Sequence, residues 1–129
     1  MNVALWVVQS ALAVVFAGSG GYKGSHAKEA IVASGQTGVT WYSIELIRFI
    51  AIAELFGAAG LILPWLLGVA RPLTPLAAVC LSIIMVGAAV SHGRLAIEKH
   101  RPREWGNVAT NVVIFAACWF VAIARFAAL

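Results

Sequence analysis

The stretch from Arg48 to Pro64 reads RFIAIAELFGAAGLILP and decides the fold class of this chain. It is long, apolar and helix-forming, and it carries a single carboxylate, Glu54, near its middle. An ionisable group at that depth in a bilayer costs about 2.5–3.5 kcal/mol on insertion scales, so it is usually sheltered by polar groups of neighbouring helices. We therefore expect Glu54 to face the interior of a helical bundle.

The composition places the chain among membrane proteins. Of its 129 residues 62% are hydrophobic, and the mean hydropathy is +0.94, whereas soluble domains average about 45–50% apolar residues. The net charge of +4 comes from basic residues that flank apolar segments, so it does not suggest a nucleic-acid partner. Cys80 and Cys118 both lie inside apolar segments without a CxxC spacing, and we expect two buried, reduced thiols.

Four segments are each long enough to cross a hydrocarbon core of ~30 Å, which takes about 20 helical residues. The sequence therefore predicts an all-α fold, an integral membrane four-helix bundle that forms a single transmembrane domain, with helices at residues 2–21, 45–67, 71–92 and 106–125. Gly68 suits the end of the second helix, and Pro72 and Pro75 suit the first turn of the third. The second and third helices should then form a tight antiparallel hairpin.

The basic residues predict the orientation of the bundle. Most of them lie in the first and third connections, and the positive-inside rule places these connections in the cytoplasm and both termini outside. The first connection, residues 22–43, fits two predictions: a short helix that is capped by Ser25 and lies in the membrane interface through Ile31 and Val32, or a disordered connector. We expect Arg48 to form a surface ion pair with Glu45, three residues earlier.

The strongly polar residues of the four helices fall in one half of the membrane. At 1.5 Å per residue, Glu54 lies ~13 Å from the cytoplasmic side, in the same half as Asn111, His92 and Lys23. Small residues next to Glu54 on its helix face permit close approach of a neighbouring helix. We predict that Glu54 lies in a pocket lined by Asn111, and that His92 and Lys23 close this pocket toward the cytoplasm.

These four residues fit three interpretations: a structural network with a neutral Glu54, a site for a small molecule or quinone head group, and a proton relay. One Glu, one His and one Asn form no specific catalytic signature, so the sequence predicts neither catalytic nor metal-ligating residues. The charge-rich segment 94–104, RLAIEKHRPRE, is explained by contact with anionic lipid or with a docking partner, without chemistry.

The chain resembles the DoxX-like family of small bacterial four-helix membrane proteins. The resemblance covers nearly the whole length and rests on four stretches: ALWVVQSALAVVFAGSGGYK, RFIAIAELFGAAGLILP, LTPLAAVCLSIIMVGAAVSHGR and NVATNVVIFAA. The family is similar to the membrane subunit of a thiosulfate–quinone oxidoreductase, and other members are implicated in redox-linked membrane assemblies. Lys23, Glu54, His92 and Asn111 match positions associated with the family pattern. The resemblance implies a multi-pass protein of a bacterial inner membrane.

Three hypotheses on function follow. The leading one is a non-catalytic membrane subunit or small-ligand-binding module in a redox-linked process. The second is a quinone-handling component of a membrane oxidoreductase, and the third is a membrane-protein assembly factor that uses its lipid-facing surfaces. We expect no resident cofactor, with quinone as the candidate ligand. The expected partners are the lipid bilayer and either another membrane protein or a second copy of this chain.

Overall fold

The computed structural model describes residues 3–129, which form helices and no strand. The elements are α1 (Val3–Ser25), α2 (Lys28–Ala33), the short 3-10 helix η1 (Thr37–Trp41), α3 (Ile44–Leu67), α4 (Leu73–Glu98) and α5 (Glu104–Ala127). Helices α1, α3, α4 and α5 are long and apolar enough to cross a membrane, so the predicted four-helix membrane fold is confirmed. The predicted start of the first helix at Asn2 lies outside the described residues.

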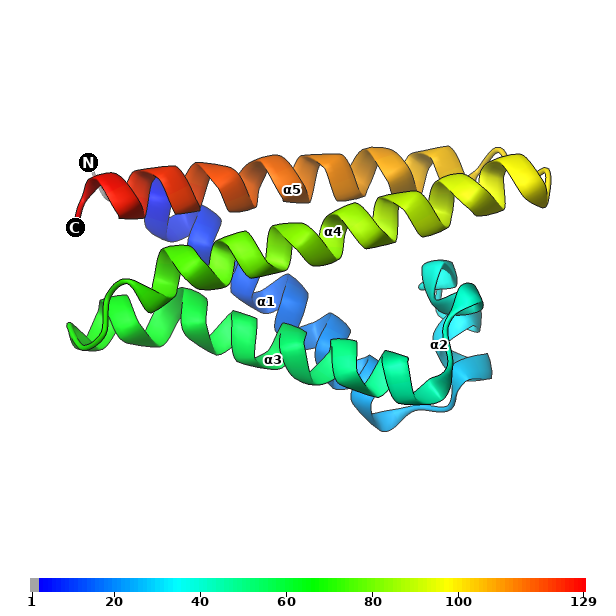
Figure 1. Cartoon of the computed structure of the whole chain (residues 1–129), viewed down its shortest axis with the longest axis horizontal. Helices are drawn as coiled ribbons and strands as arrows, with labels where there is room; N and C mark the ends of the chain where they lie inside the picture. Colours follow the sequence, from blue (N-terminus) through cyan, green and yellow to red (C-terminus); the bar gives the residue numbers. More distant parts are fainter. Residues whose placement is uncertain (1–2) are drawn as a thin grey trace.

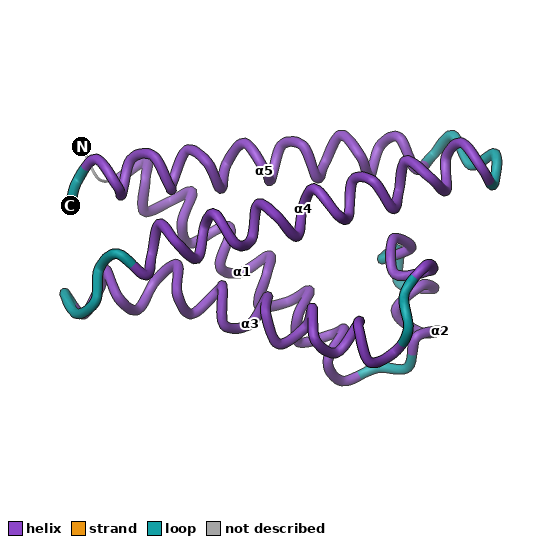
Figure 2. Tube along the Cα trace, viewed as in Figure 1, coloured by secondary structure: helices purple, strands orange, loops and turns teal. Residues whose placement is uncertain are grey.

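The helices are arranged as two antiparallel pairs. Helix α1 packs against α3, and α4 packs against α5 along its length, while α3 and α4 are joined by a short turn (Figure 1). The α3–α4 turn lies with both termini at one end of the bundle, which we call the terminal end. The two longer connections lie at the other end, the loop end, where α2 and η1 fold back over the helices (Figure 2).

The α3–α4 hairpin follows from residues that the sequence places at its turn. Gly68 adopts a left-handed conformation, φ 69°, and its N–H donates to the Pro64 carbonyl, which ends α3 as predicted. Because Pro64 has no N–H, the carbonyl of Gly60 loses its helical partner. The hydroxyl of Thr74 on α4 donates to that carbonyl at 2.9 Å, so the hairpin satisfies the group that proline leaves open.

Two predicted helix ends were wrong. Helix α1 runs to Ser25 instead of Gly21, and α4 runs to Glu98 instead of His92. Hydropathy marks only the apolar part of a helix, and the final turns of both helices are polar but still helix-forming. In α4 the added turns carry an exposed i,i+4 ion pair between Arg94 and Glu98, at 2.8 Å.

The first connection also differs from its prediction. A short helix exists, but it begins at Lys28 without a side-chain cap. Ser25 belongs to α1 instead, and its hydroxyl donates to the Gly21 carbonyl at 2.7 Å. Ile31 is fully buried and is not exposed to the membrane interface. It packs with Val39 of the same connection and with Ile47 of α3.

Arg48 and the cysteines correct two further expectations. Arg48 forms no ion pair with Glu45; its guanidinium donates to the carbonyls of Lys23 and His26, the latter at 2.7 Å. It therefore caps the carboxyl end of α1, where a cation is favourable. Both cysteines are free, and Cys118 is buried as expected, but Cys80 lies on the exposed face of α4.

At the terminal end, α5 contributes a buried cation. Arg125 is 1% exposed, and its Nε donates to Gln9 Oε1 at 2.8 Å. Its guanidinium lies 4.3 Å from the ring centroid of Trp65 and 5.0 Å from that of Trp6. Gln9 in turn donates to the Leu61 carbonyl. The charge is thus sheltered by an amide and two indole faces on α1 and α3, an environment in which cation–π contacts are strong.

Gly20 sets the distance between α1 and α3. A Cβ atom at this position would lie 2.8 Å from the Ala51 carbonyl oxygen, which is backbone and has little room to move. We expect Gly20→Ala to lower the free energy of unfolding by about 1–3 kcal/mol, the usual cost of overpacking. Unfolding of the purified protein in mixed micelles, followed by circular dichroism, measures this loss.

Gly18→Ala is the matched control, because a Cβ at Gly18 has no atom within 4 Å and the residue lies on the same helix. It should be neutral or slightly stabilising, since alanine favours helix. Equal effects at the two positions would mean that the close approach at Gly20 does not limit packing.

Candidate functional site

Glu54 is fully buried on α3 and forms an ion pair with Lys23 of α1. Lys23 Nζ donates to Glu54 Oε1 at 2.6 Å, and the two side chains are 12% and 1% exposed. The close approach of the helices at Gly20 brings Lys23, one turn further along α1, within reach of Glu54. Glu54 therefore faces the bundle interior as expected, with a charged partner rather than a neutral network.

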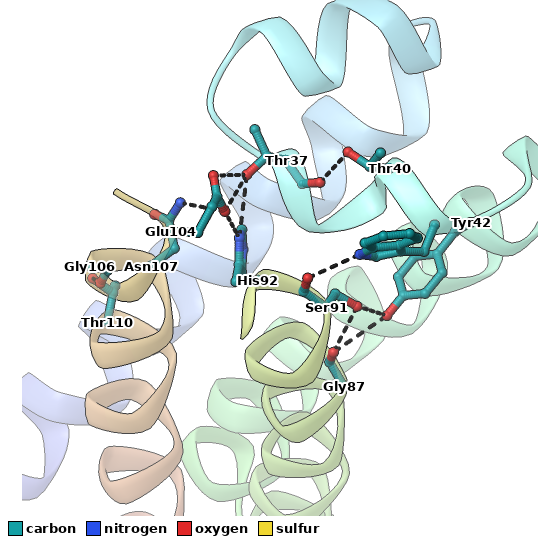
Figure 3. A network of polar contacts seen from close by, with 11 residues as sticks. Thr37, Thr40, Tyr42, Gly87, Ser91, His92, Glu104, Gly106, Asn107 and Thr110 are labelled. Carbon is teal, nitrogen blue, oxygen red and sulfur yellow. Dashed lines mark hydrogen bonds and ion pairs between the residues drawn. The ribbon is translucent and has the colours of Figure 1, made fainter. Parts of the chain in front are cut away.

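A second buried pair joins α4 to α5 at the loop end. His92 Nδ1 lies 2.6 Å from Glu104 Oε2, and we call this pair the His92–Glu104 dyad. The hydroxyl of Thr37 in η1 lies 2.8 Å from both carboxylate oxygens of Glu104, and Asn107 Nδ2 lies 3.3 Å from Oε2 (Figure 3). The Glu104 carboxylate thus ties the first connection to both helices of the α4–α5 pair.

Further hydrogen bonds hold the first connection in place. Trp41 Nε1 donates to the Ser91 carbonyl at 3.0 Å. Lys28 Nζ donates to the Tyr42 carbonyl at 2.7 Å and to the Thr40 carbonyl at 3.1 Å. We call residues 28–42 the strap, because they cross the loop end and are fastened to α4 and α5 on its far side.

Under the strap lies a cavity of about 250 Å³. Its walls come from α1, the strap, α4 and α5, and they combine polar and apolar side chains. The polar lining residues are Ser19, Lys23, Gln36, His92, Asn107 and Asn111. The apolar part includes Phe16, Val39, Met85 and Ile114.

The structure brings three of the four predicted residues to this cavity. Lys23, His92 and Asn111 line it, whereas Glu54 stands behind Lys23 and is not part of the wall. Among residues 3–129 Asn111 makes no hydrogen bond to Glu54, although the predicted pocket placed the two together, and its buried Nδ2 has no partner. The prediction assigned one polar cluster, whereas in the structure the basic residues Lys23 and His92 pair with two different carboxylates, Glu54 and Glu104.

Glu104 and Thr37 were not identified from the sequence. Glu104 was assigned to a loop without chemistry, yet it opens α5 and is buried, at 6% exposure. A signal was present, since a tight α4–α5 hairpin places the start of the fourth apolar segment beside the end of the third. Thr37 offers no such signal, because its position depends on the strap folding back over the bundle.

The two basic side chains that line the cavity already have carboxylate partners. The Lys23 ammonium is paired with Glu54, and the His92 ring is paired through Nδ1 with Glu104. His92 Nε2 is close to Gly38, where an added Cβ would lie 3.1 Å away. Within residues 3–129 no group of three or more His, Cys, Asp or Glu side chains is placed to hold a metal ion.

One of three comparisons with other proteins gives a match. Neither the curated proteins nor the solved structures contain a match to the chain. The sequence model of the DoxX-like family matches residues 7–121, a range that includes Lys23, Glu54, His92, Glu104 and Asn111. The chain therefore belongs to the DoxX-like family.

Proposed function

We propose that this protein binds a small, neutral molecule with hydrogen-bond-accepting oxygens in the cavity under the strap. It would serve a redox-linked process in a bacterial inner membrane as a non-catalytic subunit. The carrying observation is that both basic side chains at the cavity, Lys23 and His92, already have carboxylate partners, Glu54 and Glu104. An anionic ligand would add an unbalanced charge to a weakly polar site, which is costly, whereas a neutral oxygen acceptor adds none.

The donors and the size of the cavity narrow the class of ligand. Asn111 Nδ2 is a buried donor without a partner, and such a group gains most from an incoming acceptor. The cavity of about 250 Å³ lies below the ~300–1,000 Å³ of drug-sized ligand sites. A single substituted ring with carbonyl oxygens, such as a quinone head group, suits both features.

One observation favours a second candidate, a component that handles the protons of quinone chemistry. Glu104 pairs with His92 at Nδ1, and this contact fixes the orientation of the ring. The second ring nitrogen, Nε2, then belongs to a side chain that lines the cavity. A histidine oriented by a carboxylate can accept or donate a proton at Nε2. Electrons would then come from a partner oxidoreductase, and His92 would supply or remove the proton of the quinone oxygen.

The ligand proposal predicts a specific effect of Asn111. With the full chain in nanodiscs, a tail-less dimethoxy-methyl-benzoquinone should bind, and Asn111→Leu should weaken its affinity about tenfold, the usual cost of one lost hydrogen bond to a buried donor. Calorimetric titration measures both affinities. Thr110→Val is the matched control on the same helix, because Thr110 is exposed and bonds only to the Gly106 carbonyl.

Two results would contradict the proposal. One is benzoquinone binding that Asn111→Leu and Thr110→Val change equally. The other is tighter binding of benzoate than of the benzoquinone. This result would show that the site prefers an anion and that the carboxylate partners of Lys23 and His92 do not set its selectivity.

The same proposal includes an orientation with the loop end in the cytoplasm and both termini outside. Most basic residues lie at the loop end, while Arg71 and Arg125 lie at the terminal end. The loop-end residues are Lys23, Lys28, Arg48, Arg94, Lys99, Arg101 and Arg103.

Cysteine labelling tests this orientation. In a variant with Cys80 and Cys118 replaced by alanine, single cysteines at Ser34 and Lys99, both exposed, should react only when the reagent reaches the cytoplasm. A cysteine at the exposed Arg71 should react from outside in intact cells and serves as the control. The reverse pattern would invert the proposed topology.

A further inference from the structure

We infer that an apolar groove between α1 and α5 holds the hydrocarbon tail of the molecule whose head group lies in the cavity. The ligand is then a single-chain amphiphile with a neutral, oxygen-bearing head, and the groove is its tail subsite. This inference rests on the proposed function, because it requires a head group in the cavity.

The groove adjoins the cavity. It has a volume of about 290 Å³, and every residue that lines it is apolar. Val15 and Ile114 line both the cavity and the groove, so the two spaces meet at these two apolar side chains. The full lining of the groove is Val7, Val8, Ala11, Leu12, Val15, Val113, Ile114 and Ala117.

The two spaces follow each other along the same two helices. On α1 the cavity takes residues from Val15 to Lys23, and the groove continues from Val15 back to Val7. That step covers ~12 Å at 1.5 Å per residue, enough for a short alkyl or isoprenoid chain. Polarity therefore falls from the loop end through the middle of the bundle toward the terminal end, in the same direction as in an amphiphile whose head group lies at the loop end.

A second apolar groove, between α4 and α5, is the alternative path. It also touches the cavity, through Met85 and Asn111, and has a volume of about 320 Å³. Its α4 residues, from Met85 to Val90, lie at the same level as the cavity itself, so it leads sideways into lipid and not toward the membrane centre. Helices α4 and α5 are also closely packed, whereas α1 and α5 make few contacts and leave the first groove free to adapt (Figure 1).

The groove would orient the ligand more than it would increase the binding affinity. A hydrocarbon tail in a bilayer is already surrounded by apolar groups, so its move into the groove gains little hydrophobic free energy. What the groove supplies is a fixed course for the tail, which orients the head group beneath the strap. The test must therefore locate the tail and not merely compare affinities.

Photo-crosslinking locates it. The probe is dimethoxy-methyl-benzoquinone with a decyl chain that ends in a diazirine, added to the full chain in phosphatidylcholine nanodiscs. After irradiation and digestion, mass spectrometry should find the label on residues 7–12 of α1 and 113–117 of α5. Ala11→Trp fills the groove from an exposed position and should reduce this label about fivefold. Val113→Trp is a second filling variant, at 68% exposure.

Ala89→Trp, which fills the α4–α5 groove, is the matched control and should leave the label unchanged. Label on residues 86–90 of α4, or label that neither filling variant reduces, would overturn the tail subsite. Competition with the tail-less benzoquinone separates this failure from a failure of the proposed function. Label outside the groove that the tail-less benzoquinone displaces overturns only the tail subsite. Label that this competitor does not displace overturns the head-group site as well. Displacement by decanoate but not by the benzoquinone would show that the ligand is anionic.

Discussion

Replacing Glu54 with leucine is expected to lower the free energy of unfolding by about 3 kcal/mol, because removal of one partner from a buried ion pair leaves the other charge uncompensated. The remaining Lys23 ammonium would sit at a position where its side chain is 12% exposed. Denaturation of the purified protein in mixed micelles measures the loss. It is expected to exceed the effect of any single change at the exposed loop charges.

The double variant Lys23→Met, Glu54→Leu provides the control for this prediction. It removes both charges together, so it should recover most of the stability lost in Glu54→Leu. Glu54→Gln should be milder than Glu54→Leu, since the amide oxygen can still accept from Lys23. If the double variant lost as much stability as the single variants Lys23→Met and Glu54→Leu lose together, the interaction between the two side chains would contribute nothing to stability.

The second large effect is expected at Glu104. Glu104→Leu removes the common acceptor of Thr37, His92 and Asn107, and so loosens the strap, which Trp41 still fastens to α4. We expect amide hydrogen exchange in residues 28–42 to accelerate about thirtyfold, which corresponds to ~2 kcal/mol of local stability. The transmembrane helices should keep their protection, because they pack mainly against one another.

Glu98→Ala is the comparison for this effect. Glu98 also pairs with a cation, Arg94, but both side chains are about half exposed, at 51% and 49%. Exposed pairs contribute about 0–1 kcal/mol, so exchange in the strap should be unchanged. If Glu98→Ala loosened the strap as much as Glu104→Leu, the dyad would not be its fastening point.

The burial of Glu54 and the number of helices could be predicted because both follow from the cost of placing polar groups in lipid. The partner of Glu54 could not be derived in the same way. Position along each helix placed Asn111 and Lys23 in the same half of the bundle as Glu54, but this position does not say which helices are neighbours. Because α1 packs on α3, Lys23 is the group that reaches Glu54, while Asn111 lies on the other helix pair.

The two residues that the sequence analysis missed, Glu104 and Thr37, were missed for a different reason. Glu104 sits among charged residues, where hydropathy predicts a solvated loop, and only the α4–α5 hairpin turns it toward His92. The position of Thr37 depends on contacts between the strap and the bundle, which have no local pattern in sequence. Lys23, His92 and Asn111 were found because each is a lone polar group at the edge of an apolar helix.

Arg125 has a consequence for the biogenesis of the protein. Its shelter is built from Gln9, Trp6 and Trp65, which belong to α1 and α3, whereas Arg125 itself lies near the carboxyl end of α5. An unsheltered arginine at the centre of a helix costs about 2.5–3.5 kcal/mol during translocon insertion, and less toward the helix end. Helix α5 thus finds a sheltered position for this guanidinium only after α1 and α3, which precede it in the chain, have paired, so the order of synthesis matches the order in which the binding partners of Arg125 become available.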